Sequence, residues 1–213
     1  MTLRRIGIIG DVHAEDERLE SALNFFADEK VDAILCVGDV VDGAGDANRC
    51  CELLQQFHVL TVRGNHDRWM LENTMRDLPD ATAREELTND NLSFLRGLSS
   101  TRSFPTVAGR LLLCHGLGEN DMQGVAPHDE GYALECKDEL QRLRREKTVD
   151  FVIAGHMHRR MVRDFGGLIV FNAGTLSRSH QPCVATTDFG ERWLHFHDFE
   201  EDILIPYCER IEF

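Results

Sequence analysis

Three short apolar segments alternate with two helical patterns in the first 65 residues, and this alternation constrains the fold more than any other feature. The segments Arg5–Gly10, Ala33–Val37 and Val59–Arg63 are typical of buried strands. Between them, apolar residues recur at helical spacing over Glu15–Ala27 and Ala47–Phe57. A β-α-β-α-β order predicts a parallel sheet. Each strand ends in a turn rich in Gly, Asp, Asn or His, and ligands of such sheets bind at the carboxyl ends of the strands.

The rest of the chain changes from helical to strand-rich patterns. We expect a mostly helical stretch over Arg68–Leu98, broken at Leu78–Asp80, and an amphipathic helix over Tyr132–Lys147. Hairpin turns are expected at Ala108-Gly109 and Gly166-Gly167. The further expected strands are Arg102–Val107, Arg110–Cys114, Phe151–Ala154, Met161–Phe165, Leu168–Phe171, Val184–Asp188 and Arg192–Asp198. The pattern predicts an α/β fold: a four-layer α/β/β/α sandwich of two mixed β-sheets flanked by helices.

Composition narrows the class of protein. The length suits one domain, residues 1–213. The 23 basic and 37 acidic side chains give a formal charge of −14, which disfavours duplex nucleic acid and membranes as partners. Seven cysteines without a C-x-x-C pair indicate free thiols in a reducing compartment. No apolar run could span a bilayer and no signal-like segment follows the first methionine, so we expect a cytoplasmic protein. Homo-oligomerisation is left open.

Five polar clusters lie where predicted strands meet loops. They are Gly10–His13, Gly38–Gly43, Arg63–Asp67, Cys114–Gly116 and Gly155–His158. Taken alone, the first cluster is more typical of a turn whose Asp caps the following helix, and the second fits a turn with capping carboxylates as well as it fits a site. A lone histidine at a strand end is usually structural. The pair of histidines two residues apart in the last cluster indicates metal binding by itself. In an extended segment such residues point to the same side, and the same holds for the Asp and His of the first cluster.

The donor types in these clusters suit divalent transition metals. Asp39 offers a carboxylate that can bridge two ions, and Asn65 offers a neutral oxygen. His66 could donate or accept a proton, supported by Asp42. Nitrogen and oxygen donors without a thiolate suit Mn, Fe, Zn or Ni, and of these we expect Mn. His195 and His197 lack a completing ligand nearby in the sequence and are interpreted as structural, whereas His58 and His180 are interpreted as surface or loop residues.

In this order, the motifs GDVH, GDVVDG, RGNHD, CHG and GHMH resemble the calcineurin-like metallophosphoesterase superfamily, in particular its small single-domain bacterial and archaeal phosphodiesterases. The resemblance covers nearly the whole chain. It implies a site with two divalent metal ions. One ion would be held by Asp11, His13, Asp39 and His158, and the other by Asp39, Asn65, His115 and His156. It further implies that a hydroxide shared between the ions attacks phosphorus, with His66 at the leaving group and Asp42 supporting it.

A small phosphorylated substrate follows from the resemblance, and we expect a phosphodiester. In the phosphoprotein phosphatase branch an arginine follows the second Asp of the GDxxD cluster, but this chain has Gly43 there. Three alternatives remain: a dinucleoside polyphosphate hydrolase, a phosphoprotein or phosphomonoester phosphatase, and a non-catalytic binding scaffold. For the first two, Arg63, Arg68 and Arg178 could replace the missing arginine. We also expect the loop Gly116–Gly131 to form a wall of the site, with acidic residues that disfavour additional negative charge.

Overall fold

Two mixed β-sheets face each other in the computed structural model, which describes residues 1–213. The six-stranded sheet has the order β11-β10-β9-β1-β2-β3. Its strands are β1 (Arg5–Ile9), β2 (Ala33–Cys36), β3 (Leu60–Thr61), β9 (Cys183–Asp188), β10 (Trp193–Glu200) and β11 (Ile203–Glu212). β1 to β3 run parallel, as the β-α-β-α-β pattern predicts, and β9 to β11 are added antiparallel. The carboxyl ends of β1, β2 and β3 therefore meet at one edge.

The five-stranded sheet has the order β4-β5-β6-β8-β7. Its strands are β4 (Thr101–Thr106), β5 (Gly109–Cys114), β6 (Phe151–Ala154), β7 (Arg160–Asp164) and β8 (Ile169–Ala173). β5, β6 and β8 are parallel, and β4 and β7 close the two edges antiparallel. Both β7–β8 and β4–β5 are hairpins, as expected. In the first, Gly166 and Gly167 have positive φ angles of 79° and 95°, a conformation that favours glycine.

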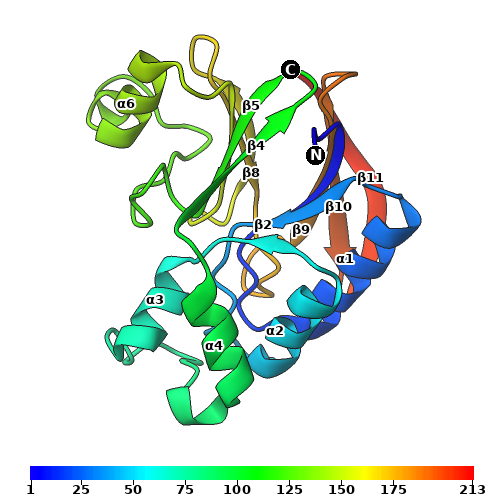
Figure 1. Cartoon of the computed structure of the whole chain (residues 1–213), viewed down its shortest axis with the longest axis vertical. Helices are drawn as coiled ribbons and strands as arrows, with labels where there is room; N and C mark the ends of the chain where they lie inside the picture. The colour runs from blue at the N-terminus through cyan, green and yellow to red at the C-terminus, as the bar shows by residue number, and fades with distance from the viewer.

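Helices cover the outer faces of both sheets, so the predicted four-layer α/β/β/α sandwich is confirmed (Figure 1). The helices are α1 (Asp16–Asp28), α2 (Ala47–Gln56), α3 (Asn65–Glu72), α4 (Asn89–Gly97), α5 (Tyr132–Glu135) and α6 (Asp138–Glu146), with a 3₁₀ turn at Arg84–Glu86. Three hydrophobic clusters fill the spaces between the layers. One joins α1, α2 and α4 to the six-stranded sheet, one lies between the sheets, and one packs α6 on the five-stranded sheet.

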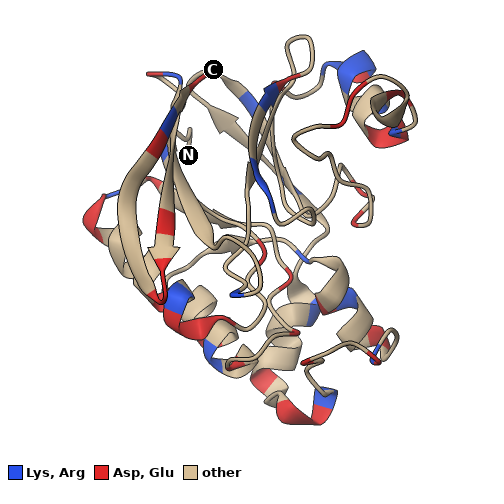
Figure 2. Ribbon diagram, turned by 180° about the vertical axis from the view of Figure 1, so that it is seen from behind, with Lys and Arg blue, Asp and Glu red and all other residues tan.

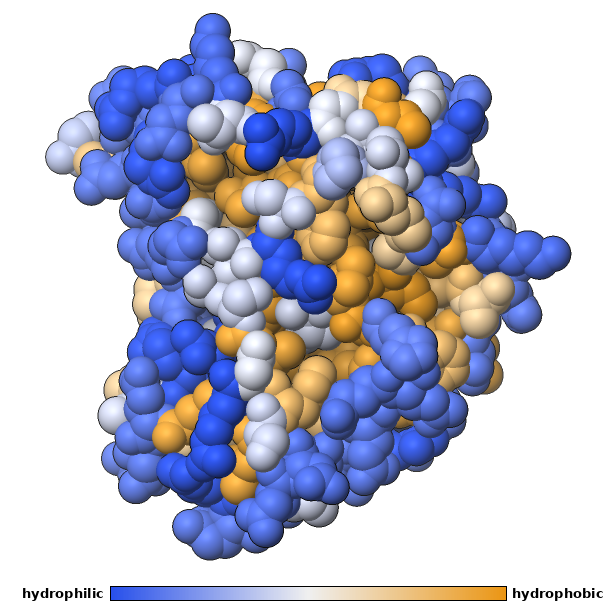
Figure 3. Space-filling view, viewed as in Figure 1, coloured by the Kyte–Doolittle hydropathy of each residue, from blue (hydrophilic) through white to orange (hydrophobic).

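Charged and apolar residues are distributed as this layering requires. The strands are mostly free of charged residues, and Lys, Arg, Asp and Glu gather on the helices, loops and sheet edges (Figure 2). Hydrophobic residues reach the surface in the middle of one face, where the two sheets meet, and hydrophilic residues surround them (Figure 3). No helix of the structure is long and apolar enough to cross a membrane.

Two predicted elements differ from the structure. The stretch expected to be mostly helical over Arg68–Leu98 is non-helical from Asn73 to Ala83, because Asn73 ends α3 with a φ of 54° and the following residues turn back toward Asp42. The helix expected over Tyr132–Lys147 is divided in two before Asp138.

The last strand, β11, was not expected from the sequence at all. It contains Pro206 and lies at the sheet edge with most of its residues exposed, so its pattern lacks the alternation of a half-buried strand. The pairing with β10, which it follows through a tight turn, therefore depends on backbone hydrogen bonds more than on a buried face.

Candidate metal centre

All nine predicted site residues lie together, in the loops that follow β1, β2, β5 and β6 and in the first turn of α3, which follows β3. Five of them have left-handed backbones, with positive φ angles between 48° and 66°: His13, Asp39, Asp42, His156 and His158. This conformation is unfavourable for residues with a side chain, and it tends to occur at functional sites. These backbone angles also show why the two residues of each i, i+2 pair lie close together. Both pairs, one after β1 and one after β6, lie beyond the end of the strand, so a turn positions them and not the alternation of side chains along a strand.

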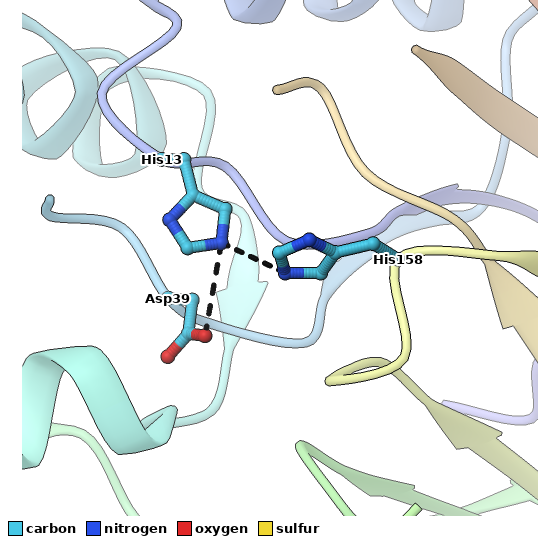
Figure 4. A group of neighbouring side chains, drawn as sticks. All are labelled: His13, Asp39 and His158. Atoms are coloured by element: carbon cyan, nitrogen blue, oxygen red, sulfur yellow. Dashed lines mark hydrogen bonds and ion pairs between the residues drawn. The ribbon is translucent and has the colours of Figure 1, made fainter. Parts of the chain in front are cut away.

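One group of donor atoms consists of His13, Asp39 and His158 (Figure 4). The Nε2 atom of His13 lies 2.9 Å from Nε2 of His158 and 3.9 Å from Oδ2 of Asp39. The Nδ1 atom of His13 donates to the backbone carbonyl of Asp42 at 2.9 Å. A neutral His13 therefore has its proton on Nδ1, and the lone pair on Nε2 faces the other two side chains.

A second group consists of Asp11, Asp39 and His115, all fully buried. Nε2 of His115 lies 3.3 Å from Oδ2 of Asp39, and its Nδ1 donates to the carbonyl of Val37. Asn65 extends this group, because its Oδ1 lies 2.8 Å from Nε2 of His115.

His156 completes the surroundings of the second group. Its Nδ1 lies 2.9 Å from Oδ1 of Asn65, and its backbone N–H donates to Oδ1 of Asp11. Every residue that the sequence proposed as a metal ligand is therefore within reach of one of the two groups. Asp11 lies between them, since its Oδ2 is 4.0 Å from Nε2 of His158.

The donor set fits divalent cations. Asp39 belongs to both groups, and one of its oxygens, Oδ2, faces both His13 and His115. Oδ2 of Asp11 is buried and has no hydrogen-bond partner, an arrangement that is costly for a carboxylate unless a cation neutralises it. The imidazole lone pairs and carboxylate oxygens converge on two positions that share Asp39. These are the donor types and the arrangement expected for transition metals.

The buried carboxylates stabilise positive charge at this site. Burial alone would lower the pKa of His115, but Asp39 and Asp11 raise it to about 10. Burial would likewise raise the pKa of Asp39, yet His115, His13 and His66 hold it below its usual range. Asp39 is therefore ionised at neutral pH, as a metal-binding carboxylate must be.

His66 lies beside the two groups and is oriented by Asp42. Its Nδ1 donates to Oδ2 of Asp42 at 2.8 Å, and its ring meets that of His13 edge-on at 4.9 Å. Burial alone would lower the pKa of His66, but Asp42 and Asp39 raise it overall. His66 thus retains a proton at higher pH than a free histidine does.

Several residues of the site were missed by the sequence reasoning. The guanidinium of Arg76 binds both carboxylate oxygens of Asp42, at 2.9 and 2.8 Å, and the N–H of Thr82 adds a third bond. Asp67 is fully buried and accepts the N–H groups of Val40 and Gly64, so it ties the loop after β2 to the loop after β3. Of these residues, only Asp67 lies within a recognised motif, RGNHD, where sequence reasoning assigned it no role at the site.

The arginines proposed as phosphate ligands are mostly engaged elsewhere. Arg68 forms a two-point ion pair with Asp121, and Arg178 forms one with the buried carboxylate of Glu15. Arg63 has no side-chain partner. This arrangement weakens the suggestion that Arg68 or Arg178 replaces the arginine missing at Gly43.

The loop Gly116–Gly131 presents less unpaired negative charge than its sequence predicts. Three of its acidic residues are engaged: Glu119 accepts from Thr101, Asp121 pairs with Arg68, and Asp129 pairs with Lys137. The loop therefore repels anions less than its composition suggests. Of the residues expected to meet an organic arm, Val125 is buried, Met122 is exposed, and Pro127 lines a pocket beside His158.

Two of the remaining histidines, His197 and His180, lie in different surroundings. His197 is fully buried, with Nε2 bonded to Thr186 and Nδ1 accepting the N–H of Tyr207, which agrees with the structural interpretation. His180 is exposed, as expected for a loop residue, but its ring lies 4.6 Å from that of His158. Its position beside the site is visible only in the structure.

Comparison with known proteins matches the chain to one family of phosphoesterases. The calcineurin-like phosphoesterase superfamily domain matches residues 5–192. An uncharacterized protein of Methanocaldococcus jannaschii is 30% identical over 105 residues, covering 46% of this chain and 43% of that protein. The chain thus matches less than half the length of this relative. Serine/threonine-protein phosphatase 2 of Escherichia coli is 25% identical over 205 residues, covering 81% of this chain and 88% of that protein.

Solved structures agree on the fold. A metallophosphoesterase from Sphaerobacter thermophilus superposes with a TM-score of 0.69 at 19% identity, covering 93% of this chain and 89% of that one. A structure described as a novel archaeal phosphodiesterase gives a TM-score of 0.59 at 16% identity, covering 92% and 99%. The family match spans most of the chain and includes every one of the nine site residues. The chain therefore belongs to the calcineurin-like phosphoesterase superfamily.

Proposed function

We propose that this phosphoester hydrolase is a dinuclear-metal phosphodiesterase. The observation that carries the proposal is the position of Asp39, whose Oδ2 faces His13 of one donor group and His115 of the other. A shared carboxylate of this kind holds two ions close together. Two divalent ions bound there would supply Lewis-acid polarisation of the phosphoryl group and activation of water.

The chain's own residues account for the rest of the reaction. His66 is held by Asp42 through Nδ1, so its Nε2 is left to face the leaving oxygen. The raised pKa of His66 favours the protonated form that a general acid requires. Arg76 neutralises Asp42 and keeps that carboxylate in one orientation. His66 acts as the proton donor, and Asp42 and Arg76 act as positioning residues.

A phosphodiester is favoured over a monoester by the surroundings of Gly43. A Cβ atom at this position would collide with the backbone carbonyl of His13, so no side chain fits here. An arginine that grips a monoester dianion from position 43 is excluded sterically. A diester carries one negative charge fewer and depends less on such a group.

A phosphomonoesterase acting on phosphoproteins is the second candidate. The observation that favours it is the similarity to serine/threonine-protein phosphatase 2 of Escherichia coli over 81% of this chain. A non-catalytic scaffold is disfavoured, because all seven donor residues are present and face one another.

The test is kcat/KM for matched nitrophenyl mono- and diesters at saturating Mn²⁺, repeated with His66→Gln. We expect the diester to be preferred. With an alkyl leaving group, His66→Gln should lower turnover by about 10²- to 10⁴-fold, the usual range for general acid catalysis. Nitrophenolate needs little protonation, so its loss should be smaller. A clear monoester preference would favour the phosphatase, and absence of turnover would favour the scaffold.

A further inference from the structure

A pocket of about 670 Å³ opens beside His158 and has an unusual lining. None of its eight lining residues is hydrophobic and none is acidic, although Asp and Glu make up 37 of the 213 residues. Two of the eight are arginines, Arg159 and Arg160, and three are histidines, His128, His158 and His180. Burial lowers the pKa of His158 and of His180, so the positive charge of the pocket comes from the arginines and the histidines add ring nitrogens. In a chain with a net charge of −14, this pocket is a local exception that favours anions.

Arg159 supplies a cation that is not used by the fold. Its neighbour Arg160 is paired with Asp198 and Glu209, and Arg178 is paired with Glu15. Arg159 is exposed and takes part in no ion pair or side-chain hydrogen bond. A guanidinium left free in an acid-free pocket can bind a phosphoryl group through two N–H donors at once.

The loop after β8, which carries His180, is held in place by the buried side chain of Glu15. Glu15 is buried and accepts both the backbone N–H of Arg178 and its guanidinium, which fixes the loop after β8. His180 follows in the same loop, and its N–H donates to Ser177. The ring of His180 then packs against His158, so the pocket and the donor groups share a side chain.

We propose that this pocket, with Arg159 as its principal cation, binds a second phosphoryl group carried on one arm of the substrate. The proposal rests on the proposed function and narrows it to phosphodiesters that carry another phosphate. His66 is not part of the pocket lining, so leaving-group protonation and arm recognition use different residues. Because His158 belongs to both the pocket and the first donor group, one molecule can extend from the reacting phosphorus into the pocket.

The kinetic test compares nitrophenyl ethyl phosphate with the same ester bearing a phosphate at the end of its ethyl arm. In the metal-loaded wild type, kcat/KM should be higher for the second substrate. Arg159→Gln should lower the ratio of the two values by about 10- to 100-fold, the worth of a charge-assisted hydrogen bond. Arg159→Lys should recover part of the ratio. Arg145→Gln, which removes an exposed and unpaired arginine on α6, should not change it.

A binding test separates this proposal from the proposed function. Calorimetry should show that propane bisphosphonate binds the metal-loaded protein more tightly than propyl phosphonate, and that Arg159→Gln removes the difference. An equal affinity of the two compounds, or an advantage that survives Arg159→Gln, would overturn the pocket assignment. Independent binding of two propyl phosphonates would indicate a free-anion site and would overturn it too. An Arg159-dependent advantage without any diester hydrolysis would support the pocket and overturn only the phosphodiesterase.

Discussion

At the scale of single residues, the centre depends on backbones that few side chains tolerate. His13, Asp39 and His158 each have a positive φ angle, and each contributes an atom to the first donor group. Left-handed residues cost on the order of 1 kcal/mol or more each, so the surrounding structure must hold them. Long-range hydrogen bonds do so, for example from the N–H of Val40 to the buried carboxylate of Asp67.

The shared position of Asp39 predicts unequal effects of ligand substitutions on metal content. The wild type should bind about two ions per chain, since two donor groups are present. Asp39→Asn should weaken both sites, whereas His13→Ala should mainly empty one. Elemental analysis after gel filtration, with calorimetric Mn²⁺ titrations, measures this. A loss of only one ion in Asp39→Asn would show that its carboxylate is not shared.

The close packing of Gly43 predicts a steric sensitivity at a position with no chemistry of its own. Gly43→Ala places a methyl group against the carbonyl of His13. We expect a loss of about 1–3 kcal/mol in unfolding free energy, together with weaker metal binding through His13. Gly97→Ala is the matched control, because nothing lies within 4 Å of the added methyl group. Urea denaturation of both variants decides the point, and equal stabilities would contradict it.

At the scale of elements, the segment between α3 and the 3₁₀ turn has a function that its sequence conceals. Residues 73–83 form no helix, and they place Arg76 and Thr82 on the carboxylate of Asp42. This carboxylate in turn holds His66. The segment therefore fixes the orientation of Asp42 and, through it, of His66, the proposed general acid.

If this segment acts through His66, the loss of activity in Arg76→Gln should depend on the leaving group. We expect kcat/KM for an alkyl diester to fall by about 10- to 100-fold, as for other residues that orient a ligand or catalyst. The nitrophenyl diester should lose less, and metal content should stay unchanged. Arg84→Gln is the control, since Arg84 reaches only the carbonyl of Leu71. Equal losses for both substrates would mean that Arg76 stabilises the site generally and does not act through His66.

At the scale of the whole molecule, the antiparallel part of the six-stranded sheet contains a buried histidine that links stability to pH. His197 on β10 lies against Thr186 of β9 and accepts the N–H of Tyr207 of β11. Burial, with His195 and Arg5 nearby, lowers its pKa to about 4. Its neutral form is therefore part of the folded sheet, and protonation would break the bond from Tyr207.

The sign of this effect is destabilisation in acid. The unfolded chain takes up a proton at His197 near pH 6.5, and the folded chain does so only near pH 4. The contribution of His197 is complete above pH 6.5 and decreases as the pH falls toward 4, by about 3 kcal/mol at most. The raised pKa values of His66 and Asp67 have the opposite effect, because protonating these two groups as the pH falls stabilises the folded state. The pH dependence of the total stability therefore does not isolate the contribution of His197.

The measurement is therefore a difference between two proteins. Unfolding free energies of the wild type and His197→Gln, both treated with EDTA, should be compared at pH 7 and pH 4.5. The wild type should lose more stability than the variant over this interval. Parallel pH profiles would show that His197 does not govern the acid response of the sheet.

The sequence by itself determined the parallel core and the identity of the donor residues. Strand and helix periodicity are local properties, and β1, β2 and β3 follow directly from them. Donor chemistry is also local, because it belongs to the residue type. Parallel strands bring their carboxyl ends to one edge, so Asp11, Asp39 and Asn65 could be expected to meet.

Only the tertiary structure decided how these donors face one another and what surrounds them. The contact of His13 with His158 joins residues 145 positions apart, and that of Asp42 with Arg76 joins residues 34 apart. Whether an arginine is free, as Arg159 is, depends on every carboxylate that the fold brings near it. β11 escaped prediction for a related reason: its order comes from pairing with β10 and not from a periodic buried face. Such contacts depend on the packing of distant segments, which no local pattern encodes.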